Sequence, residues 1–118
     1  MKIKVCGITS VDEALALHKE GVNYIGFIFY SASKRYVLNK LTLEQIKNLQ
    51  MPGVLKVGVF VNEPMDQVIA TASAAGLDMV QLHGDETPNY CKEMANQYPV
   101  IKAFRISETD DVAYKIAE

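Results

Sequence analysis

The sequence predicts an α/β domain built on a parallel sheet. Strand-like and helix-like segments alternate five times along the 118 residues, which is the pattern of repeated βα units. The expected strands begin about 21 to 31 residues apart, a spacing that accommodates a crossover containing a helix. Several of these strands are continuous apolar runs, as is typical of strands covered on both faces.

The first two units carry clear boundary signals. The first strand is expected at residues 3–6, and Thr9 or Ser10 can cap the following helix, which Gly21 ends. The second strand is expected at 24–29. Thr42 and Gln45 then form a capping box that opens the second helix.

The remaining units repeat this pattern of an apolar strand, a polar start signal and a helix. We expect strands at 55–61, 79–82 and 100–104, helices opened by Pro64 and by Thr87–Pro88, a stop at Gly76, a capping box at 107–110, and a fifth helix from Val112 to Ala117.

Composition excludes several functional classes. Twelve basic and 14 acidic side chains give a net charge of −2, without the basic stripe that nucleic acid or a membrane surface would favour. No run approaches the roughly 20 apolar residues of a membrane span, and the first residues lack a signal-peptide pattern. Cys6 and Cys91 are too few for a disulfide framework. We expect one soluble, cytoplasmic domain over residues 1–118, with free thiols.

Two architectures are built from such units. An open, doubly wound, flavodoxin-like sheet has the strand order 2-1-3-4-5 and fits the length. A (β/α)8 TIM barrel has consecutive strands side by side and needs roughly 200–250 residues. The alternating pattern fits both architectures, and the length favours the open sheet.

Polar residues follow the carboxyl ends of the expected strands, which meet on one side of a parallel sheet. A thiol, guanidinium groups and an imidazole sharing this rim suggest an anionic ligand. The rim residues are Cys6, the loop 30–35 with Arg35, Asn62, His83 and Arg105. Lys2, Lys56, Asp78 and Lys102 are expected at the opposite ends as ordinary solvated positions.

Each rim residue also has a purely structural interpretation. Cys6 is either a small buried hydrophobe or a thiolate acting as base or nucleophile. Arg35 would ordinarily be a solvated charge, and His83 a strand-end residue. Cys91 lies on an apolar helix face, where packing is the simpler role. Residues 84–86 are typical of a turn before a helix, and the dispersed glycines form no phosphate-binding motif.

Four segments in register resemble the phosphoribosylanthranilate isomerase family of tryptophan biosynthesis. They lie at residues 4–9 (KVCGIT), 26–37 (GFIFY…SKRYV), 57–62 (VGVFVN) and 80–86 (VQLHGDE), in the family's order and spacing. The resemblance implies a partial (β/α)8 TIM barrel of five parallel βα units with strand order 1-2-3-4-5. It also implies an Amadori rearrangement of N-(5′-phosphoribosyl)anthranilate, without a cofactor.

The same resemblance implies roles for individual residues. Cys6 would be the general base, and Arg35 would bind the anthranilate carboxylate of a small phosphorylated substrate. Gln81 and His83 would line the site. No metal ligand and no nucleic-acid or membrane partner is expected.

The resemblance covers five of eight units, so we expect an incomplete barrel lacking units six to eight. In the family, the general acid is an aspartate on strand six, and the phosphate site follows strands seven and eight. Asp110 and Asp111, at the start of the expected fifth helix, do not replace them. We therefore expect the chain alone to be inactive.

An incomplete barrel has further structural consequences. Its first and fifth strands would be unpaired edges prone to self-association, and interior residues such as Val5, Phe27 and Val59 would be exposed. Two other hypotheses remain at this point. One is a complete flavodoxin-like binding or signalling domain, and the other is a half-barrel that serves only as an interaction module.

Overall fold

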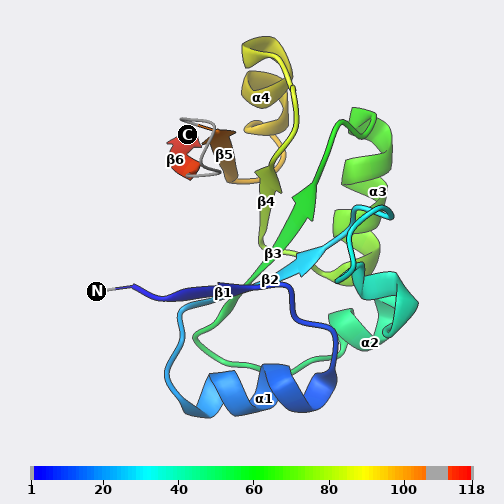
Figure 1. Ribbon diagram of the computed structural model, residues 1–118, viewed down its shortest axis with the longest axis vertical. Coiled ribbons are helices and arrows are strands. Elements are labelled where there is room, and N and C mark those ends of the chain that lie inside the picture. Colours follow the sequence, from blue (N-terminus) through cyan, green and yellow to red (C-terminus); the bar gives the residue numbers. More distant parts are fainter. Residues whose placement is uncertain (1, 106–111, 118) are drawn as a thin grey trace.

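Six strands form one sheet in the order β1-β2-β3-β4-β5-β6, so each strand lies beside its neighbours in the sequence (Figure 1). The computed structural model describes residues 2–105 and 112–117, with side chains through Ala103. Strands β1 to β5 are parallel, and β6 is antiparallel to β5. This order confirms the arrangement expected of a partial barrel and excludes the flavodoxin-like order.

The elements alternate as the sequence pattern predicts until the last one. In chain order they are β1 (Lys4–Cys6), α1 (Val11–Lys19), β2 (Tyr24–Ile28), a 3-10 helix (Val37–Asn39), α2 (Leu43–Lys47), β3 (Leu55–Phe60), α3 (Met65–Ala75), β4 (Met79–Leu82), α4 (Pro88–Met94), β5 (Val100–Arg105) and β6 (Val112–Ala117).

The expected start and stop signals set the helix boundaries. The Ser10 hydroxyl accepts a hydrogen bond from the Glu13 amide at 3.0 Å and so caps α1. Thr42 and Gln45 form the predicted capping box of α2. Gly76 ends α3 with φ of 63°, a left-handed conformation that glycine adopts without steric cost.

The main core lies between the sheet and the helices. Its members come alternately from strands and helices, and each buried aliphatic or aromatic side chain contributes roughly 1.5–3 kcal/mol. Fully buried examples are Ile25, Phe27, Val80 and Leu82 from the strands and Ala14, Ile46, Val68 and Met94 from the helices.

A second, smaller cluster lies on the opposite face of the sheet. It consists of Val57, Met79 and Ile101, with Tyr24 packed against them. On this face Lys4 of β1 donates a hydrogen bond to Gln81 of β4. Strands β1 and β4 are three positions apart, about 14 Å in a flat sheet, so this contact reflects a sheet that curls around the face away from the helices.

The expected fifth helix is wrong, because Val112–Ala117 forms strand β6. It pairs along the whole of β5, from Val100 opposite Ala117 to Arg105 opposite Val112. Valine, tyrosine and isoleucine alternate with smaller or charged residues in this segment, which suits a strand. Pairing also satisfies the backbone groups at the edge of β5. The predicted capping box at 107–110 lies outside the described residues.

Two related expectations are corrected as well. The outer edge of β5 is paired, so β5 is not an open edge. Val5 and Phe27 belong to the core beneath the helices and do not face the barrel interior, and Val59 is only 5% exposed. The strand alternation explains this result, because Val5 and Phe27 lie on the helix-covered side while Lys4 and Cys6 lie on the other.

Lys56 is buried instead of solvated. Its ammonium group donates hydrogen bonds to the carbonyl oxygens of Ile46 at 2.8 Å and Lys47 at 3.1 Å, at the carboxyl end of α2. Its backbone amide donates to the Asp78 carboxylate at 2.8 Å. A cation at a helix carboxyl terminus satisfies the last carbonyl groups and complements the helix dipole.

Among the described residues, no helix combines the length and apolar character that crossing a bilayer requires.

Candidate active site

Cys6 lies at the carboxyl end of β1, where its side chain is half-buried. The chain then turns at Gly7, whose φ of 85° favours glycine, and the amides of Gly7 and Ile8 donate to the carbonyl oxygen of Gly26 at 3.0 and 3.2 Å. Gly26 is the register partner of Cys6 on β2. A Cβ atom at Gly26 would come within 2.8 Å of the Cys6 sulfur, so this glycine provides the space that the thiol occupies.

Arg35 approaches the same strand end from the loop after β2. A Cβ atom at Gly7 would lie 2.8 Å from Nη1 and 2.9 Å from Cδ of Arg35, so the side chain lies directly against Gly7. The backbone amide of Arg35 donates to the Ser33 hydroxyl at 3.1 Å, which shapes the loop. The structure thus brings the thiol of Cys6 and the guanidinium group of Arg35 to one place, with two glycines making the room.

Gln81 lies on the interior face of β4 and is 2% exposed. Its carbonyl oxygen accepts a hydrogen bond from Lys4, two residues before Cys6 on the same side of β1. Gln81 is therefore connected to the Cys6 region through Lys4.

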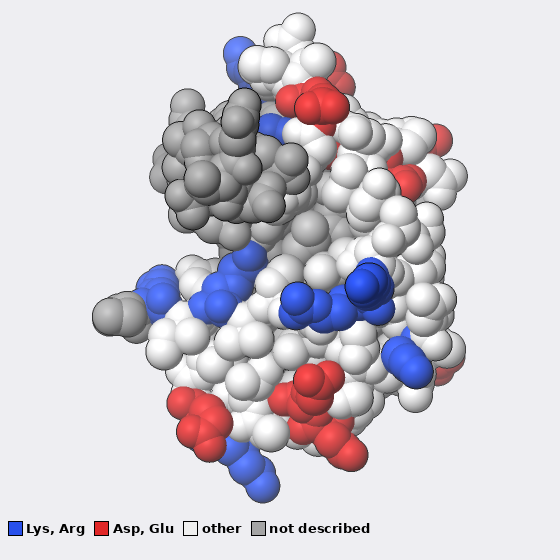
Figure 2. Space-filling view, in the orientation of Figure 1, with Lys and Arg blue, Asp and Glu red and all other residues white. Residues whose placement is uncertain are grey.

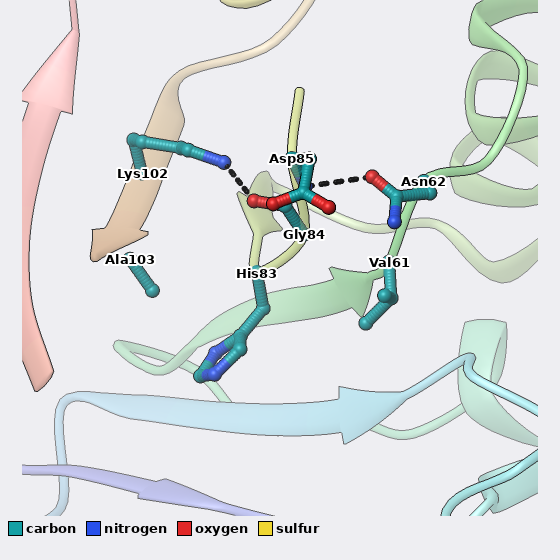
Figure 3. Close-up of a pocket in the computed structure, with 7 residues that line it drawn as sticks. All are labelled: Val61, Asn62, His83, Gly84, Asp85, Lys102 and Ala103. Atoms are coloured by element: carbon teal, nitrogen blue, oxygen red, sulfur yellow. Dashed lines mark hydrogen bonds between the residues drawn. The ribbon is translucent and has the colours of Figure 1, made fainter. Parts of the chain in front are cut away.

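His83 lines a cavity of about 490 Å³ at the carboxyl ends of β3, β4 and β5. The lining residues are Val61, Asn62, His83, Gly84, Asp85, Lys102 and Ala103 (Figure 3). The imidazole is exposed and points away from Asn62, while its backbone amide donates to the carbonyl oxygen of Phe60 at 2.9 Å. Cys6, Arg35 and Gln81 are not among the residues that line this cavity.

A buried ion pair closes one side of the cavity. The Nζ atom of Lys102 lies 2.7 Å from Oε1 of Glu86, and the two side chains are 11% and 2% exposed, respectively. The Glu86 carboxylate also accepts from the amides of Asn62 at 2.8 Å and Gly84 at 2.9 Å. Burial raises the pKa of Glu86, but the hydrogen bonds from Lys102, Asn62 and Gly84 outweigh burial and hold that pKa below its ordinary value.

Asn62 connects the loops that follow β3 and β4. It has φ of 52°, a left-handed conformation that asparagine tolerates better than most residues. Its side-chain oxygen accepts from the Asp85 amide at 2.7 Å, and Lys102 donates to the carbonyl oxygen of Gly84 at 2.6 Å (Figure 3). A Cβ atom at Gly84 would lie 2.5 Å from that asparagine oxygen, so the close approach of the two loops requires glycine.

Sequence reasoning missed Glu86 and Lys102. It interpreted residues 84–86 as a turn, which the structure retains, and placed Lys102 at a solvated strand end. The signal that could have identified the pair is the position of Lys102 within the apolar run 100–104. A charge inside a buried strand requires a partner, and Glu86 follows the neighbouring strand end.

The charged side chains are unevenly distributed over one face of the molecule. Figure 2 shows Lys and Arg atoms in a band across this face of the molecule, with Asp and Glu groups above and below the band.

Cys91 is buried in α4, and burial raises the pKa of its thiol, as expected of a packing residue. The side chain of Arg105 lies outside the described residues. In the part of the chain that the structure describes, no three His, Cys, Asp or Glu side chains gather as a metal site would require.

Comparisons with known proteins point to a single family. A sequence profile of N-(5′-phosphoribosyl)anthranilate isomerase matches residues 3–118. The N-(5′-phosphoribosyl)anthranilate isomerase of Thermotoga neapolitana is 46% identical over 112 residues, which cover 95% of this chain and 54% of that protein. This chain spans about half the length of the curated relatives it matches.

Solved structures agree with the sequence comparison. A monomeric form of the dimeric phosphoribosylanthranilate isomerase of Thermotoga maritima superposes with a TM-score of 0.82 at 39% identity, covering 93% of this chain and 56% of that one. A structure of the isomerase in complex with reduced 1-(o-carboxyphenylamino)-1-deoxyribulose 5-phosphate gives 0.83 at 38% identity, with coverages of 92% and 56%. The sheet thus matches about half of the TIM barrel of these solved isomerases, and the chain belongs to the N-(5′-phosphoribosyl)anthranilate isomerase family.

Proposed function

We propose that this chain contributes the base and the carboxylate-binding group of an isomerase that acts on N-(5′-phosphoribosyl)anthranilate. The observation that carries the proposal is the placement of both groups at the end of β1, with Cys6 against Gly26 and Arg35 against Gly7. Family membership supplies the substrate class. A relative bound to a reduced 1-(o-carboxyphenylamino)-1-deoxyribulose 5-phosphate supports a small phosphorylated anion as the ligand.

The reaction requires an acid and a base that both face the substrate. An acid protonates the ring oxygen of the ribose so that the ring opens. A base then removes the proton from C2 of the open-chain Schiff base. The resulting enolamine takes up a proton at C1 while its C2 hydroxyl loses one, which gives the ketone 1-(2-carboxyphenylamino)-1-deoxyribulose 5-phosphate. Such proton transfer steps require groups within hydrogen-bond reach of the substrate. We assign the base to the thiolate of Cys6, which is half-buried but accessible.

Arg35 is assigned to the anthranilate carboxylate, because a guanidinium group matches a carboxylate with two parallel hydrogen bonds. His83 is assigned to the wall of the site by the family resemblance, and in this chain it lines the neighbouring cavity after β3 and β4. Gln81 is assigned an indirect part, because it is buried and bonded to Lys4.

The remaining parts of the site are assigned by the family resemblance to units six to eight. We propose that residues 1–118 form one domain, an incomplete barrel that lacks the general acid and the phosphate-binding loops. No cofactor enters the proposed reaction, and a cytoplasmic location suits a biosynthetic enzyme whose Cys6 and Cys91 are free thiols.

A fused enzyme tests the assignment of Cys6. The 118 residues are joined to the carboxyl-terminal half of the Thermotoga neapolitana relative, and product formation is measured at steady state. The fusion is expected to turn over substrate, and Cys6→Ser is expected to lower kcat by at least about 100-fold. The matched control is Cys91→Ser, which should retain activity. An active Cys6→Ser fusion would contradict the proposal, as would turnover by the 118 residues alone at the rate of the fusion.

We also propose that the 118-residue chain self-associates through the outer edge of β1. In the described part of the chain β1 pairs only with β2, and an unpaired edge offers backbone groups to another chain. Light scattering on the purified chain should show a dimer or larger species. A monomer across the accessible concentration range would rule this out.

A further inference from the structure

Lys4 and Cys6 share one face of β1. They lie two residues apart in a strand, so their side chains point to the same side, away from the helix-covered core that contains Val5. The Cα atoms of two such residues lie roughly 6.6 Å apart, and Lys4 interacts electrostatically with Cys6.

Gln81 holds Lys4 in this position. Its side-chain oxygen accepts the hydrogen bond from the Lys4 ammonium group across the curled face of the sheet. Gln81 is 2% exposed and Lys4 is half-buried, so the pair is shielded from water that would screen its charge. A lysine side chain is ordinarily mobile, and this bond fixes the cation on the face of the sheet to which Cys6 also points.

We propose that Lys4 is a positioning residue for the reaction, held by Gln81 so that its positive charge stabilises the thiolate of Cys6. The inference rests on the proposed function, in which that thiolate is the base. It also explains why a neutral, buried glutamine occupies the interior of β4: a carboxylate there would neutralise the lysine, and an apolar side chain would leave its ammonium group without this acceptor.

The electrostatics of Lys4 support the proposal. Burial lowers the pKa of Lys4 below its ordinary value, while the charge of the Cys6 thiolate acts in the opposite direction and raises it. The Coulombic interaction between the two groups is mutual, so Lys4 and Cys6 lie close enough for the charge of one to act on the other.

Other titratable groups lie near the two ends of β1 and its neighbours. They are Arg35 against Gly7, Tyr24 on β2 with Lys2 over its ring, Glu13 at the start of α1 with its carboxylate near Thr9, and His83 after β4. Arg35 adds a positive charge from the loop that follows β2. Lys4 adds one from β1 itself, on the face of the sheet opposite the helices.

The test is the pH dependence of Cys6 alkylation by iodoacetamide in the 118-residue chain, in a Cys91→Ala background so that only Cys6 reacts. Lys4→Gln removes the charge but keeps a group that can bond to Gln81. It is expected to slow alkylation at pH 7 by about tenfold and to move the midpoint of the pH–rate curve upward by about one unit. Lys4→Arg, which keeps the charge, should restore the wild-type profile.

Two further variants separate the proposed role from general effects. Lys2→Gln removes the same charge from an exposed position two residues before Lys4 and should change the rate less than twofold. Gln81→Glu leaves Lys4 in place but neutralises it, and should slow alkylation as Lys4→Gln does. Gln81→Glu therefore tests the role of the Lys4 charge even if Lys4→Gln does not fold. An unchanged profile in a folded Lys4→Gln or Gln81→Glu chain would overturn the proposal, as would an equal effect of Lys2→Gln.

Alkylation does not depend on turnover, so the two proposals fail separately. If Cys6→Ser leaves the fused enzyme active while Lys4→Gln still slows alkylation, the assignment of the base is wrong and the lysine effect stands. If Cys6→Ser abolishes turnover and the Lys4 variants alkylate normally, the base is correct and the role of Lys4 is wrong.

Discussion

The end of β1 and the ends of β3 to β5 hold their polar groups in opposite ways. At the end of β1, Cys6 is half-buried and Arg35 is exposed, and glycines bring the chain close to both side chains. At the ends of β3 to β5, the Glu86 carboxylate is 2% exposed and accepts three hydrogen bonds. The first region leaves its groups accessible to a ligand, whereas the second uses its charges to join two loops.

This difference predicts that substitutions in one region change the stability of the fold, while substitutions in the other change ligand binding. A buried carboxylate with several donors contributes strongly to a unique structure, because removing it leaves a buried cation unpaired. An exposed guanidinium group contributes little to folding and can give its bonding capacity to a ligand. Substitutions in the two regions should therefore affect different measurements.

The largest expected effect is on stability. Glu86→Gln removes the charge that pairs with Lys102, whose side chain is 11% exposed, and should lower the free energy of unfolding by about 3 kcal/mol. Urea denaturation at pH 7 measures this loss. Asp85→Asn is the matched control, since it makes the same chemical change at the adjacent exposed residue and should stay within about 0.5 kcal/mol of wild type. Equal losses in the two variants would show that the network does not stabilise the fold.

The same ion pair predicts how stability depends on pH. The pKa of Glu86 in the folded chain lies below its ordinary value, so its contribution is fully present above the unfolded pKa of about 4.3. The contribution is lost as the pH falls through the lower folded pKa. The difference in unfolding free energy between wild type and Glu86→Gln should thus shrink steadily from pH 5 downward. A difference that stays constant to the acid end of the measurable range would contradict the depressed pKa.

Much of the architecture followed from local patterns in the sequence. The strand alternation predicted parallel strands, but their side-by-side order from β1 to β5 came from the family resemblance, since the length favoured the flavodoxin-like sheet. Ser10, Thr42 and Gly76 act as the predicted start and stop signals. These features depend on neighbouring residues, so a single sequence records them. The assignment of Cys6 and Arg35 to one rim also follows, since parallel strands end on the same side.

The predictions that the structure contradicts concern residues whose contacts are distant in the sequence. Val112–Ala117 carries a helix-like start signal, but pairing with the edge of β5 makes it a strand. Lys56 and Lys102 look like solvated charges, yet one caps α2 and the other pairs with Glu86. Local sequence shows that a charge is present, while its burial depends on which strand face and which loop meet in three dimensions. The bond between Lys4 and Gln81 belongs to this class too, because it needs the curl of the sheet.

The third prediction concerns ligand binding at the end of β1. Arg35→Gln should weaken binding of reduced 1-(o-carboxyphenylamino)-1-deoxyribulose 5-phosphate to the fused enzyme by about 30-fold, because a charge-assisted pair with a carboxylate is worth about 2 kcal/mol. Isothermal titration measures the change in Kd. Lys34→Gln removes the same charge from the neighbouring exposed residue and should alter the Kd less than threefold. The unfolding free energies of Lys34→Gln and Arg35→Gln should both remain close to that of the wild type, in contrast to that of Glu86→Gln.

The smallest expected effect tests how closely Gly26 and Cys6 fit. A methyl group at Gly26 would lie 2.8 Å from the Cys6 sulfur and 3.3 Å from its Cα, so Gly26→Ala should cost about 1–2 kcal/mol of unfolding free energy through overpacking. Cys6→Ala removes the sulfur and should relieve most of this strain. The two substitutions should therefore be non-additive by about 1 kcal/mol in a double-mutant cycle measured by urea denaturation. Additive costs would mean that the backbone at Gly26, and not the thiol, resists the methyl group. A clear coupling would show that the accessible region is fitted as closely around its sulfur as the buried network is around its carboxylate.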